Sequence, residues 1–329
     1  MPRQRSKTAF HLALGLILVI APARAMGQSR AGLPSVFPVN PMAEARTGLY
    51  FQPYQDLSPG WRASASLAYG SLIELNQSAF GQYLLDGEVG RLDLSLGRDL
   101  GPRIFARLDA GGGSAAAGFM DGFFNWYHQL FGLHMPEREM RPLDAFGYQM
   151  DLPDGISRAR SRGFYLNDLR VSVGRRHSDA VQSIFSVTLP VSSGESGYGK
   201  GVPSFALITT ARKAISSRLL FEGSLGFGST PRHGDLSPFQ RQEFMAGTSG
   251  FRFRTWGRQS LFVNFLYHSP YYEHTNFPAL DRKDLSLNYG WILRTRSGRE
   301  WVIGMTEDLA PSGPAIDAVF QISSSWNLP

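Results

Sequence analysis

From Trp61 to the C-terminus, the sequence alternates between apolar and polar residues in runs of about ten residues. Successive side chains of a β-strand point to opposite faces, so each run presents one apolar face and one face rich in Gly, Ser and charge. The runs cover residues 61–69, 91–96, 104–109, 168–173, 181–189, 205–213, 219–227, 242–256, 261–268, 285–293, 301–306 and 316–326. We therefore expect twelve strands, whose apolar faces must be covered by something other than water.

The connections between these runs alternate between short and long. The short ones are 99–103, 177–180, 214–217, 257–260 and 297–300. The long ones are 110–163, 192–201, 230–240, 269–282 and 310–315, with a shorter one near 76–81. Outer-membrane barrels have an even number of antiparallel strands, short periplasmic turns and long outer loops. The pattern predicts an all-β, antiparallel, up-and-down transmembrane β-barrel of about twelve strands in the cell outer membrane, with both termini periplasmic. A soluble β-sandwich, the other fold with period-two strands, does not explain the aromatic residues near the strand ends.

The N-terminus has the three parts of a secretory signal peptide. Arg3, Arg5 and Lys7 precede an apolar run over residues 9–20, and residues 23–25 form an A-x-A cleavage site. This run is too short to span about 30 Å of hydrocarbon, which needs roughly 20 residues. We expect a signal peptide at residues 1–25, whose presence is typical of a Gram-negative outer-membrane protein.

The mature chain then has two expected parts. Residues 26–60 contain a proline-rich stretch, and proline lacks the N–H group that a strand needs for pairing, so we expect an N-terminal periplasmic segment, or one tucked into the lumen. Residues 61–329 form the barrel, with a helical loop at residues 111–163.

Composition excludes several classes of site. The formal net charge is +6, but Arg3, Arg5, Lys7 and Arg24 belong to the signal peptide, which has no acid, so the mature chain keeps only +2. So small an excess argues against a nucleic-acid partner, which would need a basic patch. The sequence has no cysteine, so neither a disulfide nor a thiolate metal site can form.

The long loop contains the one stretch that predicts a helix, residues 121–133. Asp121, Asn125 and His128 share one face of it, and most other positions are aromatic. Asp121 and His128 could form an acid–base pair, or two ligands of a metal that the sequence does not identify. We favour the alternative, in which the aromatic residues pack on the rim or lumen wall and the polar stripe is wet.

Acidic residues near the strand ends suggest a site at the outer rim. Asp86 and Glu88 share the parity of lipid-facing Leu92, so either they lie above the hydrocarbon band or a bulge at Gly87 or Gly90 turns them inward. The candidate binding residues are Asp86, Glu88, Asp121, His128, Arg138, Glu307 and Asp308, with Arg141 nearby. We expect them to meet on the outer side and to pin the helix over the lumen. They form either a salt-bridged network that fixes the loop or a site for a cation or polar solute.

The lumen face also carries charge. Its residues include Arg62, Arg91, Arg107, Arg170, Asp93, Asp109 and Asp168. Eight strands are nearly filled by their own side chains and 16–18 leave a channel, so twelve enclose limited space. These charges therefore line a narrow pore, or pair with one another and plug it.

Several short motifs resemble a known family. They are Asp86-Gly87-Glu88, Gly112-Gly113, Met120-Asp121, His128, Phe131-Gly132-Leu133, Arg138, Pro142, Leu189-Pro190, Ser193-Gly194-Glu195-Ser196-Gly197 and Glu307-Asp308. In order and spacing they resemble an uncharacterised bacterial outer-membrane family, domain of unknown function 3187, from about Pro38 to the end of the chain. The resemblance implies a β-barrel and gives no activity or substrate.

Three functions fit these expectations. The first is a narrow conduit for small or lipid-related solutes. The second is a lipid-modifying hydrolase with its site in the lumen or at the rim, for which Asp121 and His128 are weak catalytic candidates and no tight nucleophile motif exists. The third is a structural or surface-interaction barrel. The expected partners are outer-membrane lipid and the barrel-assembly machinery, the expected state is a monomer, and no cofactor is expected.

Overall fold

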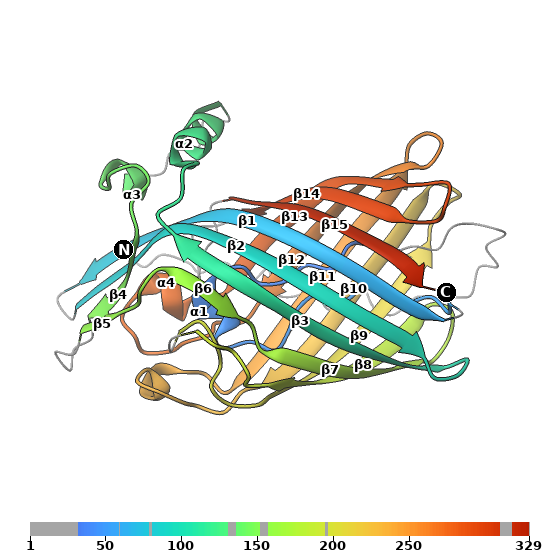
Figure 1. Ribbon diagram of the computed structural model, residues 1–329, viewed down its shortest axis with the longest axis horizontal. Helices are drawn as coiled ribbons and strands as arrows, with labels where there is room; N and C mark the ends of the chain where they lie inside the picture. Colours follow the sequence, from blue (N-terminus) through green and yellow to red (C-terminus); the bar gives the residue numbers. More distant parts are fainter. Residues whose placement is uncertain are drawn as a thin grey trace, which may run out of the picture.

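The computed structural model describes residues 32–58, 60–78, 81–130, 136–151, 157–194, 197–309 and 318–328, so the expected signal peptide lies outside the described residues. Twelve antiparallel strands close into a barrel (Figure 1), which confirms the predicted fold class. In ring order they are β1 (Trp61–Ser78), β2 (Gly81–Asp99), β3 (Ile104–Ala116), β7 (Leu169–Arg176), β8 (Val181–Leu189), β9 (Ser204–Ala214), β10 (Leu219–Ser229), β11 (Glu243–Arg254), β12 (Gln259–His268), β13 (Asp284–Arg294), β14 (Glu300–Asp308) and β15 (Ala318–Leu328). The ring closes where β15 pairs with β1.

Side-chain exposure follows the alternation of the sequence. Leu94 and Val171 are 50% and 42% exposed, whereas their neighbours Asp93 and Arg170 are 6% and 8% exposed. The apolar residues therefore point away from the barrel axis, as a lipid-facing surface requires, and the charged residues point into the lumen.

This parity predicts unequal costs for the same substitution on the two faces. Leu94→Arg should destabilise the folded barrel by about 2–4 kcal/mol, because it places a charge in the hydrocarbon band. Ser64→Arg, on the lumen face of β1, should cost much less, since Ser64 borders a wide cavity. Urea unfolding in lipid vesicles measures both, and equal costs would contradict the parity.

The two ends of the barrel differ. Tight turns join the strands at one end, which we call the turn end. At the other, the loop end, the connections are longer except between β1 and β2, which only residues 79–80 separate. Strands β1 and β2, at 18 and 19 residues, extend beyond the rest of the wall at the loop end (Figure 1). Among the described residues, no helix is both long and apolar enough to cross a membrane.

The long loop begins later than expected and adds to the wall. Residues 111–116 are part of β3, because their backbone pairs with β2. The loop contains α2 (Asp121–Leu130), α3 (Pro136–Glu139), β4 (Gly147–Asp151), β5 (Ser157–Ala159) and β6 (Gly163–Leu166). Strand β4 pairs with β2 above the end of β3, and β6 pairs with β3 above the end of β7. The other loops contain the short helices η2 (Ser237–Phe239) and α4 (Pro278–Asp281).

Residues 32–58, which we call the plug, lie inside the barrel. Helix α1 (Pro41–Glu44) begins with two favourable features, a proline in its first turn and the side chain of Asn40, which accepts a hydrogen bond from the Met42 amide at 2.9 Å. Val39, Met42 and Leu49 are 3%, 1% and 2% exposed, and they join side chains of the barrel wall in one hydrophobic cluster. The segment expected at residues 26–60 thus occupies the lumen from residue 32 onward, and it supplies much of the core.

Candidate functional site

The plug and the lumen wall are joined first by Arg91. Its guanidinium lies 2.6 Å from Glu44, makes two hydrogen bonds to Asp93 at 2.7 and 2.8 Å, and donates to the Pro38 carbonyl at 2.8 Å. Burial raises the pKa of Glu44 above its usual range, and the positive charge of Arg91 opposes that shift. One wall arginine therefore holds an acid of the plug, an acid of the wall and a plug carbonyl.

A second junction forms around Asp109. Its carboxylate accepts hydrogen bonds from the Tyr50 hydroxyl at 2.8 Å and from the Arg107 Nε at 2.7 Å. The Arg170 guanidinium lies 3.8 Å from the centre of the Tyr50 ring, and Phe37 stacks on the same ring at 4.6 Å. A cation over an aromatic face is attracted by the ring quadrupole, so Arg170 adds to the hold on Tyr50.

Further polar contacts fix both ends of the plug. At the turn end, Asp56 forms an ion pair with Arg212 at 2.5 Å, and Arg176 donates to the Gln55 carbonyl at 2.6 Å. At the loop end, Arg46 is 1% exposed and donates to the carbonyls of Thr230, Pro231 and Arg241 at 2.8–3.1 Å. The lumen charges expected to line a pore or to plug it are thus largely occupied with one another and with the plug.

Several cavities border the plug along the barrel. One of about 840 Å³ lies at the turn end and is bordered by Arg62, Arg107, Arg176 and Arg212. A cavity of about 280 Å³ lies at the loop end beside Met42. Between them, a cavity of about 100 Å³ separates the middle of the plug from the wall formed by β11 to β15.

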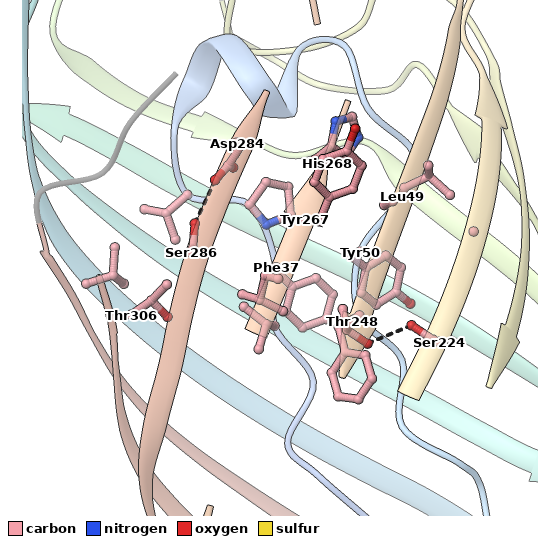
Figure 2. Close-up of a pocket in the computed structure, with 18 of the residues that line it drawn as sticks. Phe37, Leu49, Tyr50, Ser224, Thr248, Tyr267, His268, Asp284, Ser286 and Thr306 are labelled. Atoms are coloured by element: carbon pink, nitrogen blue, oxygen red, sulfur yellow. Dashed lines mark hydrogen bonds between the residues drawn. The ribbon is translucent and has the colours of Figure 1, made fainter. Parts of the chain in front are cut away.

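Figure 2 shows this middle cavity. Phe37, Leu49 and Tyr50 reach it from the plug, and the wall contributes two polar pairs. Ser286 donates to Asp284 at 2.6 Å, and Ser224 and Thr248 are hydrogen-bonded at 2.8 Å. Cavities therefore lie beside the plug at both ends of the barrel, and a smaller, largely apolar one lies beside its middle.

The helix of the long loop does not lie over the lumen, contrary to our expectation. Phe124 is fully buried and stacks on Phe320 at 5.9 Å, and the Tyr127 hydroxyl lies 3.2 Å from that of Tyr289. Phe320 and Tyr289 are on the outward face of the wall, so α2 packs against the outside of the barrel. The described residues of the helix end at Leu130, and the remainder expected to residue 133 lies outside them.

Asp86 and Glu88 also point outward, and no bulge turns them. The register of β1 with β2 is unbroken through Gly87 and Gly90. Both acids are nonetheless almost fully buried, because the loop covers them. Asp86 accepts from the Arg141 Nε at 2.7 Å, whereas Glu88 accepts from the Tyr69 hydroxyl and, at 2.6 Å, from the Met120 amide.

Helix α2 is fixed to the same surface through Asp121. Its carboxylate accepts from Arg138 at 2.7 Å and from the Asp144 amide at 2.8 Å, while Arg138 also donates to Ser71 of the wall. His128 is 4% exposed, and burial, followed by the charge of Arg138, lowers its pKa. This side of α2, which we expected to be wet, faces the barrel.

The last two candidates lie on opposite faces of β14. Glu307 has outward parity and lies near Tyr127, whose pKa is raised by burial, by Tyr289 and by Glu307. Asp308 has the inward parity of Thr306, so it does not join the outer group, which consists of Asp86, Glu88, Asp121, His128, Arg138 and Arg141. Within the described part of the chain, no three potential ligands are grouped as a metal site would require. The outer group is a network in which arginine side chains and backbone amides donate hydrogen bonds to the buried carboxylates.

The contacts of the plug could not be identified from the sequence. Glu44, Arg46 and Tyr50 occur in a segment without period-two alternation, so no pattern assigned them to a face. The available signal was compositional, since buried charges on the lumen face need partners, and a proline-rich segment next to β1 could supply them.

Comparison with known proteins gives a family match and a fold. The family model described as "Protein of unknown function (DUF3187)" matches residues 11–327. None of the curated proteins matches the sequence.

Among solved structures, an outer-membrane channel from Pseudomonas putida F1 has a TM-score of 0.54 at 13% identity, covering 84% of this chain and 98% of that chain. The NanC porin has a TM-score of 0.46 at 7% identity, covering 82% and 100%. The CymD monoaromatic hydrocarbon channel has a TM-score of 0.44 at 9% identity, covering 88% and 91%. The first of these likenesses supports the outer-membrane barrel fold.

Proposed function

We infer from the plugged barrel that this chain, which belongs to the DUF3187 family of proteins of unknown function, is a conduit for small solutes that opens when the plug rearranges within the lumen. We place the turn end and both termini in the periplasm and the loop end outside the cell, as is usual for barrels with short periplasmic turns.

The observation that carries this proposal is the way in which the plug is held. Besides the hydrophobic contacts of Val39, Met42 and Leu49, its attachments are discrete ion pairs and hydrogen bonds centred on Arg91 and Asp109, and cavities separate other parts of it from the wall. A lumen filled only for stability would be expected to approach the close packing of a protein interior, with few voids larger than a water molecule. Space on both sides of a polar-tethered segment is instead consistent with local movement.

A reversible crosslink tests whether that movement is needed. A Cβ built on Gly48 of the plug would lie 3.5 Å from the Cβ of Ser204 in β9, within reach of a disulfide. Since the chain has no native cysteine, Gly48→Cys with Ser204→Cys would form a defined bond. In proteoliposomes, oxidation should abolish the influx of small solutes, and a reductant should restore it.

The single variant Gly48→Cys, treated with the same oxidant and reductant, is the matched control and should keep its influx throughout. Equal influx through the oxidised and reduced double variant would show that the plug need not move at this point. No influx through the reduced double variant or the unmodified protein, for any small solute tried, would contradict the conduit itself.

A further inference from the structure

Helix α2 has the reverse of the usual amphipathic arrangement. Its ionisable side chains, Asp121 and His128, face the barrel and are almost fully buried. Its outward face carries Phe123, Trp126 and Leu130, which are 40%, 56% and 62% exposed, together with the uncharged Gly122 and Gln129. A helix at a water-exposed surface turns its polar face to solvent and its apolar face to the protein. The arrangement in α2 is the one expected of a helix whose outer surroundings are apolar.

Neighbouring parts of the loop continue this surface. Phe119, Met140 and Leu143 are 75%, 68% and 59% exposed, which gives this part of the loop six exposed large apolar side chains, and the neighbouring Glu139 and Asp144 are exposed as well. We call Phe119, Phe123, Trp126, Leu130, Met140 and Leu143 the outer face of the loop. An exposed apolar surface of this extent usually marks an interaction site.

The loop is firmly attached where this face begins. Phe124 lies between Phe320 of β15 and the guanidinium of Arg138, which is 5.9 Å from the Phe124 ring centre. Arg138 in turn joins Asp121 to Ser71 of β1. The direction of the outer face is thus set by buried contacts with the wall, and it continues the lipid-facing surface of β13 to β15.

The length of the wall places α2 at the membrane surface. Strand β14 has nine residues. At about 3.3 Å per residue and a tilt of about 45°, such a strand rises roughly 21 Å, slightly less than the apolar band of about 25 Å. A helix that covers the loop-end half of this wall therefore lies at the level where hydrocarbon meets the headgroups, where amphipathic helices bury their apolar faces.

We propose that the outer face of the loop is a lipid-binding surface, which inserts among the acyl chains of the leaflet at the loop end and completes the lipid-facing belt over β13 to β15. The buried acids Asp86, Glu88 and Asp121 then have a clear role. Because they are paired and buried beneath the loop, these three carboxylates stay out of contact with lipid, whereas Glu139 and Asp144 are exposed and have to lie at the level of the headgroups. This proposal does not depend on whether the barrel conducts solutes.

Spin labels at single introduced cysteines test the proposal in the full-length protein in phospholipid vesicles. Leu130→Cys reports on the outer face, and Phe123→Cys is a second variant in case the first does not fold. Leu94→Cys marks the lipid-facing belt, and Ser297→Cys, in an exposed turn, marks water. We expect labels at positions 130 and 123 to favour collisions with oxygen, which partitions into lipid, over a water-soluble nickel complex, as the label at 94 does and the label at 297 does not.

Two outcomes would overturn the proposal. Collision with the nickel complex at positions 130 and 123 as frequent as at 297 would show that the loop faces water. Protection from both reagents, together with a dimer on crosslinking, would show that a second copy of the chain covers this face.

Discussion

Deletion of residues 32–58 should convert the barrel into a permanently open pore. The wall closes through β1 and β15 without help from the plug, so the barrel should still insert. The lumen would lose the segment that separates its cavities, and the charges around Arg91 and Asp109 would become hydrated. Twelve strands enclose more space than the eight that side chains alone fill.

We expect solute influx into proteoliposomes to rise by on the order of tenfold or more, with a matching rise in single-channel conductance. A variant in which residues 32–58 are replaced by a Gly/Ser linker of equal length controls for the length of chain that precedes β1, because such a linker behaves as a flexible coil. Slower migration of unheated samples would reveal a barrel that failed to fold. Unchanged influx through a correctly folded deletion variant would show that the plug is not the barrier.

Arg91→Met should release the middle of the plug. Glu44 and Asp93 would remain buried without their shared cation, and removal of one partner from a buried ion pair costs about 3–5 kcal/mol. We expect protease cleavage within residues 32–58 and faster hydrogen exchange of the plug amides, while the wall strands remain protected.

Arg98→Met is the matched control, since Arg98 lies on the same strand but is exposed. This substitution should leave the plug protected from protease cleavage and from hydrogen exchange. Adding Glu44→Gln to Arg91→Met should recover part of the protection, because a neutral amide is less costly to bury than an unpaired carboxylate. Full protection in Arg91→Met alone would mean that Tyr50 and the ends of the plug hold it without Arg91.

The barrel itself was predictable because its signal is local. Asp93 and Leu94 point in opposite directions wherever the strand lies, so parity follows from the sequence. The position of α2 was not predictable in this way. Whether α2 packs against the inner or the outer face of the wall depends on Tyr69, Ser71 and Phe320, which are distant from α2 in the sequence.

One signal was nevertheless present in the sequence. Ser71, Asp86 and Glu88 occupy lipid-facing positions, and polar groups there need a cover. A bulge or a position above the membrane would satisfy these groups, but so does a loop folded down against the outer wall, which is the solution in this structure.

The order of the chain has a consequence for biogenesis. The plug directly precedes β1, and the partner that completes the ring, β15, is the last strand of the chain. This seam can form only once β15 is present, so until then the plug can take its place through an open side of the sheet rather than by threading through a finished ring. In such an order Arg91, Asp109 and Arg212 can engage the plug while the sheet is still curling. The N-terminal segment would then act as a template around which the wall is wrapped, and it would influence the rate of assembly before it ever controls passage.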